Sequence, residues 1–179
     1  MDLPIGKRAI GCKWVYKKKE AISEKQGEQF KACLVAKGYS QRKGVDYDEI
    51  FSPMVRHTSI RVVLAMVAHL DMELEHMDVK TAFFHGDLEE QIYMEYPEGF
   101  SQPGQEHLVC KLKKSLYGLK QSPRQWYKRF DSYMIQIGYK RCEYDCCVYV
   151  KSLDNSSYIF LLLYVDDMLI AAKSMIEVN

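Results

Sequence analysis

Hydrophobic and polar positions follow a strand-like pattern most clearly near the end of the chain. Seven consecutive apolar residues, Ile159 to Val165, form a run that is too short to span a membrane and is typical of a buried strand. Asp166 and Asp167 interrupt this run, and Met168 to Ala172 is apolar again. The pattern therefore predicts a hairpin that carries both carboxylates at its tip.

Two segments instead show the helical period. The first begins at Thr58, a suitable N-cap, and the second begins at Ser122, with Pro123 at the first helical position and Gly138 as the C′ residue. The predicted buried stripe of the first helix is Ile60, Val63, Leu64, Val67 and Ala68. The predicted buried stripe of the second helix is Trp126, Phe130, Tyr133, Met134 and Ile137.

Shorter alternating segments predict further strands. Residues 12–17 and 30–37 suggest an antiparallel hairpin with basic residues on one side, joined by the polar stretch 19–29, and residues 91–95 and 107–112 suggest two more strands. A strand over residues 73–78 would place Leu74, His76 and Asp78 on one face. We interpret His76 as an ordinary half-buried strand residue. Strands with two separate helices predict an α+β fold.

Composition indicates a folded chain, and the charge is unevenly distributed. The 179 residues include 47% hydrophobic residues and carry a net charge of +1, so the chain could be one domain or a piece of a larger one. Residues 1–44 carry +7, residues 45–109 carry −10, residues 110–151 carry +7 and residues 152–179 carry −3. These blocks could pair with one another as solvated faces. They could also form basic walls for a nucleic acid around an acidic, metal-binding floor.

Targeting signals and cysteine spacing narrow the class of protein. Lysines and arginines break residues 1–21, so no signal peptide or membrane-spanning segment is visible, and we expect an intracellular protein. The six cysteines form no CxxC pair and are expected to be reduced thiols. Cys142, Cys146 and Cys147 have the wrong spacing for zinc, and no histidine lies near them in the sequence.

The adjacent carboxylates are the strongest candidates for chemistry. Asp166 and Asp167 repel each other unless a cation or a proton lies between them, which is why such pairs often bind divalent metals. Asp78, delivered by a strand beside the hairpin tip, would complete a cluster of three carboxylates. A plain surface turn is the alternative interpretation of the dipeptide, because aspartate is common in turns.

Four motifs carry a resemblance to a known family. In order along the chain, they are HMDVKTAFFHGDL, KKSLYGLKQSPRQWY, RCEYDCCVYV and LLLYVDDMLIA. Together they closely resemble the reverse transcriptase of copia-type LTR retrotransposons, from about Leu3 to Lys173. The resemblance implies an RNA-directed DNA polymerase core from a retrotransposon Pol polyprotein.

The resemblance also implies a metal site and its partners. Asp78 matches the first catalytic aspartate, and Asp166 and Asp167 match the YxDD pair. With Val79 these residues would hold two Mg²⁺ ions, for which Mn²⁺ could substitute. The implied partners are an RNA or DNA template with its primer, deoxynucleoside triphosphates, and the thumb, RNase H and integrase of the polyprotein, inside cytoplasmic particles.

A nucleotide pocket is implied by the same family pattern. Phe83 falls at the bulky gate position, where an aromatic ring would clash with a ribose 2′-hydroxyl and so favour deoxynucleotides. Ala82 resembles the residue whose backbone faces the triphosphate. The other nucleotide-binding residues implied are Lys37, Tyr117, Gly118 and Gln121.

The implied domain layout alternates between fingers and palm. Residues 1–57 would form a basic fingers hairpin and loop, 58–90 a first palm segment, 91–120 a return to the fingers, and 121–179 a second palm segment with the YVDD hairpin. From the resemblance we expect the thumb and RNase H to lie outside these residues, so that the implied fold is a polymerase palm, an antiparallel sheet backed by helices, truncated after that hairpin.

One residue departs from the family pattern. Cys33 stands where the pattern has Arg, and we expect weaker binding of phosphates there, partly offset by Lys31 and Lys37. This substitution, and above all the expected truncation after the YVDD hairpin, leave an inactive retrotransposon relic, or a nucleic-acid-binding module without catalysis, as the alternative to an active polymerase core.

Overall fold

The computed structural model describes residues 1–19, 28–101, 103–153, 157–174 and 176. The chain divides into two compact units. The first unit comprises Met1–Ile50 and Phe83–Gln125, and the second comprises Phe51–Ala82 and Trp126–Asn179. Within these described ranges, two α-helices and mainly antiparallel sheets make a mixed α and β fold, as the sequence pattern predicts. Among the described residues, no helix combines the length and the apolar character needed to cross a membrane.

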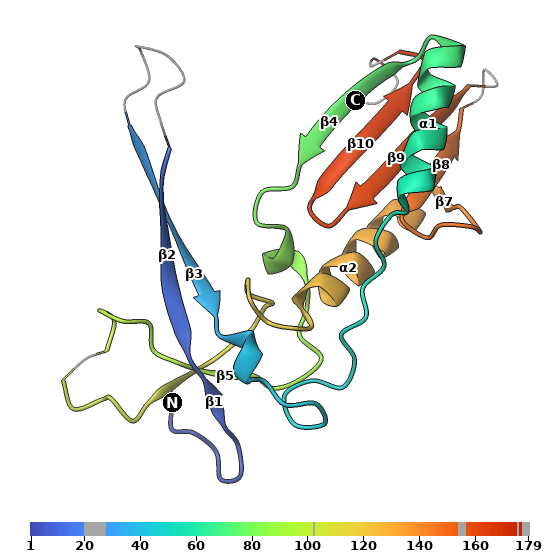
Figure 1. Cartoon of the computed structure of the whole chain (residues 1–179). Coiled ribbons are helices and arrows are strands. Elements are labelled where there is room, and N and C mark those ends of the chain that lie inside the picture. The colour runs from blue at the N-terminus through green and yellow to red at the C-terminus, as the bar shows by residue number, and fades with distance from the viewer. Residues whose placement is uncertain (20–27, 102, 154–156, 175, 177–179) are drawn as a thin grey trace. The chain divides into compact units, whose positions relative to one another are not determined.

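A two-stranded ribbon is the most extended part of the first unit (Figure 1). Strands β2 (Cys12–Lys19) and β3 (Gln29–Ala36) pair antiparallel, so that Cys12 lies opposite Ala36 and Lys18 opposite Phe30. This pairing confirms the predicted basic hairpin. Most of its predicted polar connection, residues 20–27, lies outside the described residues.

The structure also describes a small sheet of the first unit and two short 3₁₀ helices, the second of which begins at Ala82, the last residue of a second-unit segment, and continues into the first unit. Strand β5 (Tyr93–Glu95) pairs in parallel with β1 (Ala9–Ile10) and antiparallel with β6 (Val109–Lys111). The 3₁₀ helices are η1 (Gly38–Ser40) and η2 (Ala82–His85). The buried core of this unit consists of Ile10, Ala36, Ile92, Met94, Leu116 and Leu119.

Two glycines allow the backbone of the first unit to pack closely after β3. A Cβ atom added at Gly38 would lie 1.9 Å from the carbonyl oxygen of Gly118. A Cβ atom added at Gly118, whose φ is +92°, would lie 2.1 Å from the carbonyl oxygen of Ala36. Both positions therefore require glycine, and a backbone hydrogen bond of 2.8 Å from Ala36 to Tyr117 holds the same approach.

The second unit is built on a five-stranded antiparallel sheet with strand order β4-β10-β9-β8-β7 (Figure 1). Its strands are β4 (Glu73–Asp78), β7 (Lys140–Arg141), β8 (Val148–Ser152), β9 (Tyr158–Tyr164) and β10 (Asp167–Ala172). Strands β9 and β10 form the hairpin that the apolar runs predict. Strand β10 is an interior strand, because it pairs with β9 on one side and with β4 on the other.

Helix α1 (His57–Leu70) packs on one face of this sheet. Its Ile60, Val63 and Val67 join a core with Val148, Leu162, Phe160, Leu169 and Ala171 from the sheet. The predicted stripe is wrong at Leu64 and Ala68, which are both exposed. Leu64 and Ala68 lie at the edge of the helical face, and the inward face is narrower than the apolar pattern suggests.

The start of α1 differs from the prediction in its capping residue. Arg56, not Thr58, is the N-cap, and it has no side-chain capping hydrogen bond. Asp145, from the loop before β8, supplies the missing acceptor: one carboxylate oxygen accepts from the Arg56 backbone N–H at 2.9 Å and from the Ser59 hydroxyl at 2.6 Å. The side-chain acceptor at the start of α1 is therefore Asp145, which is distant in the sequence, whereas the sequence pattern suggested the local residue Thr58.

Helix α2 (Ser122–Gln136) begins where Ser122 and Pro123 predict. Its buried apolar residues are Trp126, Phe130 and Met134, while Tyr133 and Ile137 are exposed, so the predicted stripe is too wide. Gly138 has φ +93°, and the Tyr139 N–H donates to the Met134 carbonyl at 3.0 Å. This geometry matches the predicted glycine C′ position.

Candidate functional site

The β9–β10 hairpin ends in a two-residue turn that carries Asp166. Tyr164 and Asp167 are paired, so Val165 and Asp166 form the turn between them. Val165 has φ +59°, a left-handed conformation that a β-branched side chain rarely adopts. The Trp126 indole N–H donates to the Val165 carbonyl at 2.7 Å and thereby holds the turn from α2. The strained backbone lies next to the candidate acidic residues.

Strand β4 brings the third aspartate to this turn. Asp78 and Asp167 are direct partners across the antiparallel β4–β10 pair, and the Val79 N–H donates to the Asp166 carbonyl at 2.9 Å. Because paired residues project to the same face of a sheet, the side chains of Asp78 and Asp167 share one face. The structure thus brings together the backbones of all three predicted catalytic aspartates and of Val79.

The donor atoms of this acidic end suit a hard divalent cation. Asp78 is exposed, while Asp166 and Asp167 are half-buried, so all three carboxylates are accessible to solvent ions. Mg²⁺ prefers carboxylate oxygens, waters and substrate phosphates. The three carboxylates are not already gathered to coordination distance. Among the described residues, the group whose ligand atoms all lie within 4.8 Å of one another is Asp145, Cys146 and Cys147.

That second group has a structural role in its present contacts. Besides Arg56 and Ser59, Asp145 accepts a hydrogen bond from the Cys147 backbone N–H at 3.0 Å. Burial raises the pKa of the Cys147 thiol to about 12, so this thiol stays protonated at neutral pH. Metal binding requires a thiolate and free carboxylate lone pairs, and these contacts oppose both.

One neighbour of the acidic end was not predicted as a functional residue. His76 lies on β4 two residues before Asp78, and its Nε2 is 3.0 Å from Oδ1 of Asp167. The sequence showed that Leu74, His76 and Asp78 share a strand face, and β4 confirms this. The contact with Asp167 could not be predicted, because it depends on the register between β4 and β10, and a local sequence pattern does not determine that register.

The predicted gate residue makes its contacts in the first unit. Phe83 is buried, and its ring lies 4.5 Å from the ring of Tyr117, measured between centroids, while Phe84 meets Tyr117 edge-on at 5.9 Å. The three rings form one aromatic cluster. Ala82, which belongs to the second unit, is completely buried.

Gln121 is also completely buried, and its amide has protein partners. Its oxygen accepts from Gln41 Nε2 at 3.0 Å, and its nitrogen donates to the Asp46 carbonyl at 3.0 Å and to Glu90 at 3.3 Å. A direct contact with a nucleotide would require this network to open. Lys37 remains half-buried beside Gly11 at the end of β3.

The β2–β3 ribbon carries its aromatic side chains on one face, where Lys18 lies opposite Phe30, and most of its lysines on the other. The strand register and alternation place Trp14, Tyr16 and Phe30 on one face and Lys17, Lys31 and Cys33 on the other. Tyr16 and Phe30 are respectively 74% and 76% exposed. Phe100, which is also exposed, lies 5.8 Å from Trp14 between ring centroids. Exposed aromatic rings beside lysines are typical of surfaces that bind single-stranded nucleic acid.

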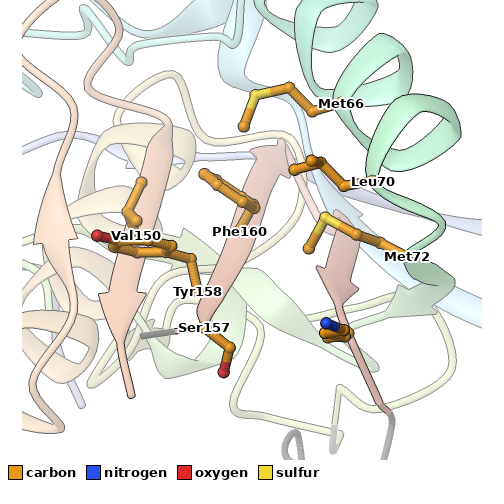
Figure 2. Close-up of a pocket in the computed structure, with 8 residues that line it drawn as sticks. Met66, Leu70, Met72, Val150, Ser157, Tyr158 and Phe160 are labelled. Carbon is orange, nitrogen blue, oxygen red and sulfur yellow. The ribbon is translucent and has the colours of Figure 1, made fainter. Parts of the chain in front are cut away.

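An apolar cavity lies at the other end of the second unit's sheet. Figure 2 shows Met66 and Leu70 of α1, with Met72, near Phe160 of β9. The cavity has a volume of about 560 Å³. Its remaining lining residues are Val150, Ser157, Tyr158 and Lys173. Val150 lies on β8, Ser157 and Tyr158 lie at the start of β9, and Lys173 follows the end of β10, whereas the aspartates lie where β9 turns into β10. The cavity and the three aspartates therefore lie in different places on the sheet, and the cavity is not part of the acidic site.

Comparison with protein families gives a match over the whole chain. The family model described as "Reverse transcriptase (RNA-dependent DNA polymerase)" matches residues 1–179. No solved structure gives a significant match.

Curated relatives are polyproteins of transposons. The chain is 57% identical over 177 residues to the "Retrovirus-related Pol polyprotein from transposon TNT 1-94" of Nicotiana tabacum, which covers 97% of this chain and 13% of that protein. It is 42% identical over 164 residues to the corresponding polyprotein from transposon RE1 of Arabidopsis thaliana, covering 92% of this chain and 11% of that protein. It is 29% identical over 170 residues to the "Transposon Ty1-DR4 Gag-Pol polyprotein" of Saccharomyces cerevisiae, covering 94% and 10% respectively. The chain therefore spans only a small part of these relatives.

Proposed function

The chain belongs to the reverse transcriptase family, and from this premise we propose that it forms the catalytic core of an RNA-directed DNA polymerase within a retrotransposon Pol polyprotein. The observation that carries this proposal is the pairing of Asp78 with Asp167 beside the turn that holds Asp166. Separate parts of the chain thereby supply three carboxylates to one end of a sheet. Nucleotidyl transfer needs such an acidic end because it binds metal-complexed phosphates.

Asp78, Asp166 and Asp167 would hold the Mg²⁺ ions, with the Val79 backbone alongside. When bound, two such ions favour the primer 3′-hydroxyl as a nucleophile and stabilise charge on the α-phosphate and the leaving pyrophosphate. The protein contributes the fixed register of β4 against β10 and a turn pinned by Trp126. Like-charged carboxylates on paired strands repel each other, so the site gains stability when cations are present.

The two units correspond in this proposal to fingers and palm. The sheet of the second unit, with α1 on one face, would be the palm that holds the aspartates. The first unit, with the β2–β3 ribbon, would be the fingers. Template, primer and deoxynucleoside triphosphates would be the partners, with the remaining Pol segments as further domains.

The incoming nucleotide would meet residues of the first unit. Phe83 would act as the sugar gate, supported by its contact with Tyr117. Tyr117, Gly118 and Lys37 would lie along the nucleotide, with the Ala82 backbone facing the triphosphate. Gln121 would support this pocket through its buried hydrogen bonds to Gln41 and Asp46, beyond any direct contact that it makes.

A nucleic-acid-binding module without catalysis is the second candidate function. The observation that favours it is the ribbon itself, which combines exposed Tyr16 and Phe30 with lysines on the reverse face. The ribbon needs no metal to bind a polynucleotide. Cys33, where the family pattern has Arg, lies on the lysine face.

Primer extension distinguishes the two candidates. We would assay poly(rA) primed with oligo(dT) using the 179-residue chain and a longer chain that includes downstream polyprotein sequence. Asp166→Ala should lower the rate by about 10³-fold, since lost metal stabilisation of the transition state amounts to several kcal/mol. Glu75→Ala is the matched control, because Glu75 is an exposed acid on β4 that points to the opposite face from Asp78. Equal rates for Asp166→Ala and the unchanged sequence would refute the polymerase proposal.

A further inference from the structure

The contact between His76 and Asp167 is fixed by strand register. Asp167 pairs with Asp78, and His76 pairs with Leu169, so His76 is the diagonal neighbour of Asp167 on the same face of the sheet. The distance from His76 Nε2 to Asp167 Oδ1 is 3.0 Å, which is a normal hydrogen bond. Both side chains project from regular strands rather than from mobile loop positions.

The chemistry of the two groups sets the direction of this bond. An ionised carboxylate only accepts hydrogen bonds, so the proton must lie on His76 Nε2. The bond occupies Oδ1 of Asp167 and leaves Oδ2 as the oxygen available to another partner. On its inner side the pair borders a cavity of about 320 Å³ that Ile60, Leu162 and Leu169 line with apolar groups. His57 and Tyr164 also line this cavity, and the hydrogen bond to Asp167 comes from His76.

We propose that His76 is a positioning residue for the metal site. It orients the Asp167 carboxylate by holding one oxygen, so that the other faces the cation shared with Asp78. This inference rests on the proposed function, because it assumes that Asp78 and Asp167 are metal ligands. It goes further by assigning a role to a side chain that touches neither metal nor nucleotide.

A donor at this position also relieves a conflict between the two acids. Asp78 and Asp167 are like charges on directly opposed positions, and each raises the energy of the other when ionised. The N–H of His76 places a partial positive charge beside one of these two carboxylates. Outer partners of this kind commonly fix ligand orientation in metal sites, and their loss typically weakens metal affinity by about 10- to 100-fold.

Three substitutions at position 76 separate orientation from packing. His76→Gln places an amide N–H near the location of Nε2, while His76→Asn places it near the location of Nδ1. His76→Phe keeps an aromatic ring on the strand without any donor. The proposal requires a donor at the Nε2 location, so only His76→Gln should preserve the bond to Asp167.

Binding of Mn²⁺ alone to the 179-residue chain provides the measurement. Electron paramagnetic resonance reports free Mn²⁺ directly, so the assay needs neither nucleotide nor turnover. We expect His76→Phe and His76→Asn to weaken Mn²⁺ binding by about tenfold, and His76→Gln to stay within about threefold of the unchanged sequence. Thermal unfolding without metal should be nearly the same for all four proteins, since the bond is largely exposed.

Two further variants make the outcomes separable. Asp78→Asn and Asp167→Asn should each weaken Mn²⁺ binding more than any change at His76. If these two variants bind Mn²⁺ normally, the metal site itself is refuted. If they weaken binding while His76→Phe does not, or if His76→Gln loses as much affinity as His76→Phe, the metal site stands and the positioning role of His76 is refuted.

Discussion

Asp78 of β4 lies directly opposite Asp167 of β10, although 88 residues separate them in the sequence. This register places two acids on one face, and the adjoining turn adds Asp166. Cross-strand pairs of like charge destabilise a sheet when nothing compensates them. A sheet that keeps such a pair at the end of two neighbouring strands is suited to binding a cation there.

The first prediction concerns Phe83, the buried residue that we propose as the sugar gate. Phe83→Val should raise the incorporation of ribonucleotides relative to deoxynucleotides by about tenfold, because a smaller side chain relieves the clash with the 2′-hydroxyl. The variant also loses the ring contact with Tyr117, so its free energy of unfolding should fall. Primer extension with matched ribo- and deoxynucleoside triphosphates measures the sugar preference.

Phe84→Val is the matched control for this prediction. Phe84 also contacts Tyr117, but it is 38% exposed and is not the gate position in our proposal. It should leave sugar preference unchanged. An unchanged preference in Phe83→Val would refute the gate assignment.

The second prediction concerns the aspartate that caps α1. Asp145→Ala should lower the free energy of unfolding by about 3 kcal/mol, because it leaves the Arg56 and Cys147 N–H groups and the Ser59 hydroxyl without their acceptor. Urea denaturation followed by circular dichroism measures the change. Glu143→Ala, at a nearby exposed acid, should change stability by less than about 0.5 kcal/mol. Equal effects of the two variants would contradict the capping role.

Local pattern predicted the elements better than it predicted their partners. The apolar runs at 159–165 and 168–172 were enough to predict the hairpin, and Ser122, Pro123 and Gly138 marked α2, because these signals act within a few residues. The cap of α1 was misjudged, because its acceptor is Asp145, 89 residues from Arg56. Long-range partners of this kind leave no periodic trace in the sequence.

The candidate site shows the same division. The acids themselves could be found from a dipeptide, a strand pattern and a family resemblance. The His76 contact could not, because it depends on the register between β4 and β10. The family resemblance also predicted that Gln121 binds the nucleotide. In the structure its side chain is buried and forms hydrogen bonds with three protein partners, Gln41, Asp46 and Glu90.

The third prediction concerns the strained hairpin turn. Val165→Asn should raise the free energy of unfolding by about 1 kcal/mol, because asparagine adopts the left-handed conformation at φ +59° at lower cost than a β-branched residue. Val165→Ile, which is also β-branched, should give no gain. Chemical denaturation of both variants tests this, and a gain in Val165→Ile equal to that in Val165→Asn would exclude backbone strain as the cause.

The fourth prediction restores the charge that the family pattern has on the ribbon. Cys33→Arg adds a cation to the face that carries Lys17 and Lys31. It should tighten binding of single-stranded oligonucleotide and steepen the slope of log affinity against log salt by about 0.7. Fluorescence anisotropy over a salt series measures both quantities. Ala32→Arg places the same charge on the opposite face and is the matched control. Equal changes of affinity and salt slope in the two variants would show that oligonucleotide binding does not depend on which face of the ribbon carries the charge.

The fifth prediction concerns alkaline pH. Burial raises the pKa of Cys147 to about 12 from a model-peptide value of 9.0, so the folded state retains this proton after the unfolded chain has lost it. The resulting contribution to stability is complete below pH 9 and is lost progressively between about pH 9 and 12. Tyr127, whose pKa burial raises from 10.0 to about 12, adds to the loss over the upper part of the same range.

Cys147→Ala should therefore show a shallower decline of unfolding free energy above pH 9 than the unchanged sequence, despite lower stability at neutral pH. Cys33→Ala, at a half-buried thiol on the ribbon, should leave the slope of that decline unchanged. A decline equally steep in Cys147→Ala would mean that ionisation of this thiol does not drive alkaline unfolding.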